Sequence, residues 1–324
     1  MKNLSMKILT QIMPAAFLLT VAFTSCKKTD TTVVSATVTA DSMQTTSVAA
    51  QSNDQATVTK QVDAIANDAN TSLEASVAFN GKIDNTVGVL GIICNTTSVY
   101  DSVSAVKKIT VTYNGATCDG TQLMYGTIIY TMPNAKHWKD TGSIVTITTQ
   151  NLKIIRVRDS NTIVLNGVRT MTNVWGGKLS NLAVGGYIEH AIIDSNMVIT
   201  FDNGTQRSWQ VAKKRVFTRD NNGIIITTTG LHTQDSLSGI SEWGINRFGF
   251  AFTNAITTPL VVLQSCNYRL VSGTITDSSL NNSIHITYGL NAAGLPTTCP
   301  VGNYYYKIGW TNAKGEAKTA IKVY

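Results

Sequence analysis

Alternation of apolar and polar residues with a period of two, in short segments separated by turn residues, constrains this chain most. Segments 144–148 and 155–158 read Ile-Val-Thr-Ile-Thr and Ile-Arg-Val-Arg, a pattern typical of strands with one buried face. Hairpin-type residues stand between such segments, as in Asn-Gly at 114–115 and Asp-Asn-Gly at 202–204. For residues 79–324 the sequence therefore predicts an all-β fold, a multi-stranded antiparallel meander or sandwich.

A weak repeat runs through this predicted β body. Three alternating strands end in an aromatic residue at or next to a glycine turn, and they occupy residues 109–115, 198–204 and 284–289. Their aromatic residues are spaced by about 88 residues, as expected for internal duplication. Duplication would divide the body into units at about 94–180, 181–265 and 266–324. Chance recurrence in a Thr-rich β protein is the alternative.

The N-terminus has the layout of an export signal. Lys2 and Lys7 make it positive, residues 14–23 are mainly apolar, and Cys26 follows. The apolar run is too short to span a bilayer as a stable helix. Residues 1–25 are therefore predicted to be a signal peptide.

The residues around Cys26 carry a resemblance. Residues 23–28 read Phe-Thr-Ser-Cys-Lys-Lys, which resembles the lipobox of bacterial lipoproteins in its Bacteroidota form. The resemblance implies that Cys26 becomes the mature N-terminus and carries acyl chains such as palmitate, which would anchor the protein in a membrane. The alternative is an ordinary secretory signal in which Cys26 has no special role.

The whole chain also resembles uncharacterised Bacteroidota lipoproteins with a tether, a short helix and a β-rich body. Members that reach the cell surface tend to carry acidic residues after the cysteine, whereas Lys27 and Lys28 stand there in this chain. The resemblance therefore favours the periplasmic face of the outer membrane over the cell surface. An exported location also argues against a nucleic acid as partner.

Four further cysteines are expected to be oxidised in such a compartment, and they are Cys94, Cys118, Cys266 and Cys299. Four cysteines allow three pairings, and the sequence alone does not choose between them. If the first and third repeat units are duplicates, each holds an equivalent pair. This favours disulfides Cys94–Cys118 and Cys266–Cys299.

The segment between the signal and the β body divides in two. Residues 26–51 are small and polar without an aromatic residue, so they are predicted to form a flexible tether. Ser52 and Gln55 match a helix capping box, and apolar residues recur at helical spacing as far as Leu73. One amphipathic helix is predicted over 52–78. A partly ordered extension of the tether is the alternative.

The sequence lacks the patterns of known catalytic and metal sites. Its four histidines have no metal-ligand spacing, and it has no CxxC pair, GxSxG elbow, P-loop or GxGxxG after a strand. We assign no catalytic residue, no metal site and no cofactor. The expected function is a non-enzymatic binding or scaffolding role at the cell envelope, with an envelope protein or a glycan as partner.

Two sets of residues offer alternatives. Trp138, Trp175 and Trp243 lie near turns or strand ends, where exposed rings would stack on sugars, although a Trp in a sheet is more often core. They support the alternative of a glycan-binding or glycan-hydrolysing lipoprotein. Basic residues cluster at 153–158 and 213–219. We interpret them as solvated sheet faces, with contact to phosphates, acidic glycans or an anionic membrane as the alternative.

Overall fold

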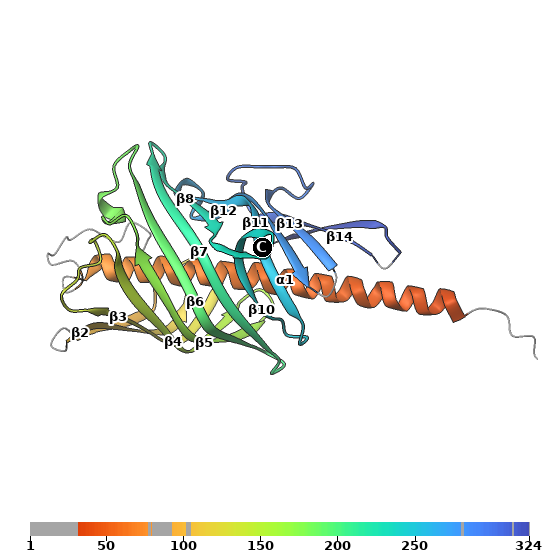
Figure 1. Ribbon diagram of the computed structural model, residues 1–324, viewed down its shortest axis with the longest axis horizontal. Coiled ribbons are helices and arrows are strands. Elements are labelled where there is room, and N and C mark those ends of the chain that lie inside the picture. The colour runs from red at the N-terminus through yellow and green to blue at the C-terminus, as the bar shows by residue number, and fades with distance from the viewer. Residues whose placement is uncertain are drawn as a thin grey trace, which may run out of the picture.

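A computed structural model gives the architecture (Figure 1) and describes residues 32–76, 79, 93–101, 105–279, 282–312 and 314–323. The predicted signal peptide and Cys26 lie outside the described residues. In the described part, one long helix precedes 15 strands that form a single sheet. Neighbouring strands pair in antiparallel fashion. The predicted all-β class with one helix near the N-terminus is confirmed.

The helix, α1, spans Thr32–Ala75, whereas we expected 52–78. It therefore takes up most of the segment predicted to be a flexible tether. Val48 gives one physical reason, because its side chain is buried in an apolar cluster with Tyr288 and Trp310 of the sheet. The sheet thus supplies the apolar partners that the polar segment lacks in itself.

The strands follow in chain order, with these bounds: β1 Thr96–Asp101, β2 Val106–Ala116, β3 Gln122–Pro133, β4 Ser143–Arg156, β5 Thr162–Asn173, β6 Tyr187–Phe201, β7 Gln206–Asp220, β8 Gly223–Gly230, β9 His232–Gln234, β10 Leu237–Ile245, β11 Ala251–Leu263, β12 Arg269–Ser279, β13 Asn282–Leu290, β14 Tyr305–Thr311 and β15 Ala317–Val323. From β1 to β7 and from β10 to β15, each strand pairs with the next one. The predicted meander is therefore present over most of the sheet.

Between β7 and β11, the position of one strand in the sheet is occupied by two shorter strands, β8 and β10. β8 pairs with residues 213–220 of β7, and β10 pairs with residues 208–211. β11 is divided between β8 and β10 in the same way. At the junction, a Cβ atom on Gly230 would lie 2.0 Å from the carbonyl oxygen of Gly239, so only glycine permits this close approach.

The sheet curves around α1, and the N-terminal part of the helix projects beyond it (Figure 1). One face of the helix, with Ile65, Ala69 and Leu73, packs into an apolar core with residues of β2–β7. Val48 and Ala56 contact a second core built by β11–β14. The helix is therefore the centre around which both halves of the sheet pack. Within the described ranges, no helix has the length and apolar character needed to cross a membrane.

Both predicted disulfides are confirmed. Cys94–Cys118 closes the β1–β2 hairpin, with a Cα–Cα distance of 5.2 Å. Cys266–Cys299 closes the β12–β13 hairpin, with a Cα–Cα distance of 4.9 Å. The two bridges thus occupy equivalent positions in the first and third predicted repeat units. The duplication itself stays a prediction.

Candidate functional site: a cationic cavity beside the helix

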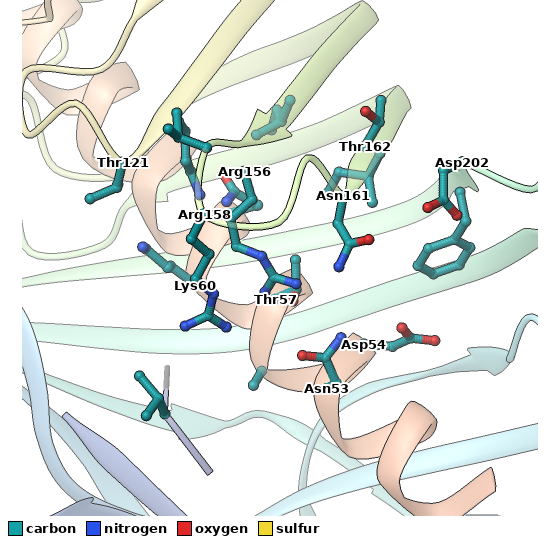
Figure 2. A pocket seen from close by; sticks show the side chains of 18 of the residues that line it. Asn53, Asp54, Thr57, Lys60, Thr121, Arg156, Arg158, Asn161, Thr162 and Asp202 are labelled. Carbon is teal, nitrogen blue, oxygen red and sulfur yellow. The ribbon is translucent and has the colours of Figure 1, made fainter. Parts of the chain in front are cut away.

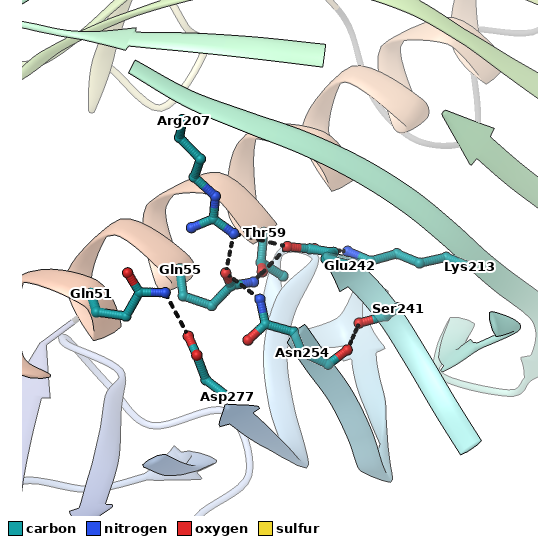
Figure 3. A network of polar contacts seen from close by, with 9 residues as sticks. All are labelled: Gln51, Gln55, Thr59, Arg207, Lys213, Ser241, Glu242, Asn254 and Asp277. Carbon is teal, nitrogen blue, oxygen red and sulfur yellow. Dashed lines mark hydrogen bonds and ion pairs between the residues drawn. The ribbon is translucent and has the colours of Figure 1, made fainter. Parts of the chain in front are cut away.

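The interior around α1 is strongly polar (Figure 3). Gln55 donates from Nε2 to Glu242 (2.6 Å) and to Thr59 (3.0 Å), and its Oε1 accepts from Arg207 and Asn254, both at 2.6 Å. One amide thereby links the helix to β7, β10 and β11. Because every partner is buried, this polar network is a packing feature rather than a surface open to ligands.

Charge within the network is balanced by direct pairing. Glu242 lies 2.5 Å from Nζ of Lys213 and 3.7 Å from Nη2 of Arg207. Burial raises the pKa of the Glu242 carboxyl, but these two cations lower it by more, so the pKa lies below its ordinary value. Sliding α1 along the sheet would break the hydrogen bonds that Gln55 makes to Glu242, Arg207 and Asn254. The network therefore fixes the position of the helix.

Further along the helix, other polar contacts also join α1 to the sheet and its connections. Arg215 donates to Asn67 (2.9 Å), and Tyr113 donates to Asp68 (2.8 Å). At the C-terminal end of α1, the Glu74 carboxylate accepts from the backbone N–H groups of Leu179 (2.5 Å) and Ser180 (3.1 Å). Helix and sheet are joined by polar groups along most of their contact.

A cavity of about 540 Å³ lies between the middle of α1 and the turns at one end of the sheet (Figure 2). Its walls come from helix residues 50–61, the β2–β3, β4–β5, β6–β7 and β10–β11 turns, the start of β12 and the C-terminal strands. The volume falls within the usual range of small-molecule sites. The cavity is therefore the best candidate site in the described part of the chain.

The β4–β5 turn positions two of the basic side chains. Ser160 has a φ of 57°, and its N–H donates to the carbonyl of Arg156 at 2.8 Å. Asp159 accepts from Nε of Arg156 (2.8 Å) and lies 2.7 Å from its Nη2, so that guanidinium is held in one orientation. Arg158 is more loosely placed, 3.7 Å from Asp159.

Basic side chains dominate the cavity lining: Lys60, Arg156, Arg158, Arg247 and Arg269 stand against Asp54 and Asp202. Figure 2 shows Lys60, Arg156 and Arg158 gathered in one part of the cavity. Burial lowers the pKa of the Lys60 ammonium, and Arg269 and the two neighbouring arginines lower it further, although Asp119 opposes them. An anion bound there would relieve this repulsion.

At the opposite end of the cavity, Arg247 is already paired with a carboxylate. Arg247 makes a bidentate pair with Asp54, with Nε 2.6 Å from Oδ2, and its guanidinium lies 3.6 Å from the centre of the Phe201 ring. Burial raises the pKa of Asp54 above its ordinary value, and the hydrogen bond from Arg247 lowers it only in part. The cavity is therefore cationic at one end, whereas at the other end Arg247 stands against Asp54 and Asp202.

The cavity also has apolar walls. Ile154, Ile163 and Phe201 line it from the sheet, and Tyr306 lines it from β14. All four are nearly fully buried. The space beyond the cationic end is therefore bounded in part by apolar side chains, although these keep little exposed surface of their own.

The three candidate tryptophans lie in different surroundings. Trp138 is fully buried, and its Nε1 donates to Asn70 at 3.1 Å. Trp243 is half-buried and stacked on His232, with ring centres 4.3 Å apart. Trp175 is 57% exposed and lies 4.6 Å from the ring of Tyr187. Among the three, only Trp175 presents an exposed ring.

The two basic segments also differ from expectation. Lys213 is buried beside Glu242 and Arg215 is buried beside Asn67, so their interpretation as part of a solvated face is wrong. Their partners on α1 and β10 replace the water that we assumed. Arg156 and Arg158 instead line the cavity. Lys60, Arg247 and Arg269, which complete the basic lining, were missed because they come from distant segments.

Four acidic residues of the β body, Asp119, Glu189, Asp194 and Glu242, lie in different surroundings. Glu242 and Asp194 are buried inside the sheet, whereas Glu189 is partly exposed near Lys214 and Asp119 lies in the β2–β3 turn. Within the residues that the structure describes, no group of three or more His, Cys, Asp or Glu side chains is placed to hold a metal ion. Comparisons with family models, curated proteins and solved structures found no match.

Proposed function

We propose that this protein is a lipid-anchored envelope protein with a non-enzymatic role, and that it binds an anionic ligand in the cavity beside α1. The observation that carries the proposal is the excess of basic over acidic side chains in a cavity of about 540 Å³. A site of this kind attracts anions through its local field and holds them through charge-assisted hydrogen bonds.

The anchor part of the proposal rests on the sequence around Cys26. Two or three acyl chains would give lasting attachment, at about 0.8 kcal/mol per buried CH₂ group. The periplasmic face of the outer membrane remains the favoured location. Both confirmed disulfides suit an oxidising compartment.

The anchor is tested by labelling cells with radioactive palmitate. We expect label in the wild-type protein, and none in Cys26→Ser, which should also leave the membrane fraction. Label that persists in Cys26→Ser would contradict the assignment of Cys26. Protease treatment of intact cells tests the membrane face, because release of the β body would place it at the cell surface.

Glycan binding is the second candidate, favoured by the exposed Trp175–Tyr187 pair. Such rings form a platform on which a sugar can stack. A glycan array should give signals that Trp175→Ala and Tyr187→Ala abolish. Val184→Ala is the matched control, because this exposed apolar residue lies in the same β5–β6 connection. Signals that survive both aromatic substitutions would remove this candidate.

A further inference from the structure

We propose that the cationic end of the cavity binds a phosphate monoester that carries an apolar substituent. The inference deepens the proposed function and rests on it. It names a ligand class from three properties of the cavity: its net charge, the geometry of its arginines and the apolar walls beside them.

Charge balance selects a dianion. Four cations act at this end, and they are Lys60, Arg156, Arg158 and Arg269. Two carboxylates oppose them: Asp159 pairs with Arg156, and Asp119 acts on Lys60. Among the described residues, these four positive and two negative charges leave a net charge of +2 at this end of the cavity. A phosphate monoester carries about −1.5 to −2 at pH 7, whereas a carboxylate carries only −1.

The geometry of the arginines suits phosphate. Arg156 is oriented in advance by its two contacts with Asp159, and its remaining N–H groups stay available. Neither Lys60 nor Arg269 has a carboxylate within ion-pair distance among the described residues. The planar fork of a guanidinium matches two phosphate oxygens, and a lysine adds a point charge. Three arginines and one lysine thus form a site for a phosphoryl group.

The apolar walls of the cavity indicate that the ligand carries an apolar substituent beside its phosphate group. Ile163 lines the cavity from β5, Phe201 lines it from the end of β6, and Tyr306 lines it from β14. Inorganic phosphate would fill only part of about 540 Å³. An apolar substituent would occupy the remaining space, and its own surface would gain about 25 cal/mol for each Å² removed from water.

The test is calorimetric titration of the mature protein in nanodiscs of a zwitterionic lipid, with empty nanodiscs as the blank. Hexyl phosphate, hexanoate and inorganic phosphate separate the contributions of charge and chain. We expect hexyl phosphate to bind at least tenfold more tightly than either of the others. Arg158→Gln and Arg269→Gln should each weaken hexyl phosphate at least fivefold. Lys153→Gln is the matched control, because this exposed lysine on β4 lies outside the cavity.

A further titration distinguishes two sources of the phosphate monoester, a lipid headgroup and a free ester. Dihexanoyl phosphatidic acid presents the phosphate monoester as a lipid headgroup, whereas hexyl phosphate presents it as a free ester. Tighter binding of either one supports the inference and identifies the source. Unchanged unfolding transitions establish that the Arg variants are folded.

The outcomes also separate this inference from the proposed function. Arginine-dependent binding of hexanoate without binding of either phosphate ester would overturn the inference and leave an anion-binding cavity. Binding of no anion at all would overturn both. Phosphate-ester binding that Arg158→Gln and Arg269→Gln leave unchanged would place the site elsewhere and also overturn the inference.

Discussion

The side-chain amide of Gln55 on α1 donates a hydrogen bond of 2.6 Å to the carboxylate of Glu242 on β10, inside the curved sheet. Glu242 in turn pairs with Lys213 on β7. A neutral helix residue therefore completes the coordination of a buried ion pair that belongs to two strands. Helix and sheet depend on each other for polar satisfaction as well as for apolar packing.

This dependence predicts a large loss of stability in Glu242→Gln. The substitution leaves Lys213 and Arg207 buried without their carboxylate, and a broken buried pair costs about 3–5 kcal/mol. Gln55→Ala should cost about 1–3 kcal/mol, because it removes hydrogen bonds without removing a charge. Denaturant unfolding measures both changes, with the exposed Lys153→Gln as control. Equal stability of wild type and Glu242→Gln would contradict the role of the network.

Asp194 should make stability depend on pH. Burial raises its pKa to about 7, although the nearby Arg169 lowers it in part. The folded state then holds a proton that the unfolded state loses at a pH near 4. Its contribution is fully present below pH 4 and is lost as the pH rises through about 7. Asp194→Asn should therefore gain stability relative to wild type between pH 4 and pH 8.

Denaturant unfolding of both proteins at pH 4, 6 and 8 checks this expectation. Asp235→Asn is the control, because this exposed residue lies in a turn after β9. A difference between wild type and Asp194→Asn that stays constant with pH would contradict the assignment. A stability of Asp194→Asn that falls relative to wild type as the pH rises would also contradict it.

The second disulfide should support the cavity as well as the fold. Cys266–Cys299 links residues that flank β12 and β13, with a separation of 33 residues. Replacing both cysteines by Ser should lower the free energy of unfolding by about 3–4 kcal/mol, mainly through the entropy of the unfolded chain. Arg269 follows Cys266 closely, so anion binding should weaken too. Unfolding and titration of the double variant measure the two effects, and Cys94→Ser with Cys118→Ser is the comparison.

The strands could be predicted because their signals are local, and the disulfide pairing could be predicted by comparing the first and third repeat units. Alternation fixes which residues share a face, and hairpin residues fix where the chain turns. The length of α1 could not be predicted in this way. Its stripe is thin in large apolar residues, because much of its surface faces polar partners such as Arg207 and Glu242. Those partners come from strands far away in the sequence.

The sequence pattern around the buried basic residues contains one indication of their burial that we did not use. Lys213 and Arg215 share their face of β7 with Trp209, Val211 and Phe217, and all five are buried. The aromatic members identify this as the inner face. The cavity left no such signal, because its basic residues come from α1, from turns and from strand ends that only the folded sheet brings together.

The most direct test of the account is an experimental structure of the protein crystallised with hexyl phosphate at a saturating concentration. We predict that the phosphoryl group lies within hydrogen-bond distance of Arg158 and Arg269, and that the hexyl chain contacts Ile163 or Phe201. An empty cavity, or hexyl phosphate bound only at another place, would contradict the account.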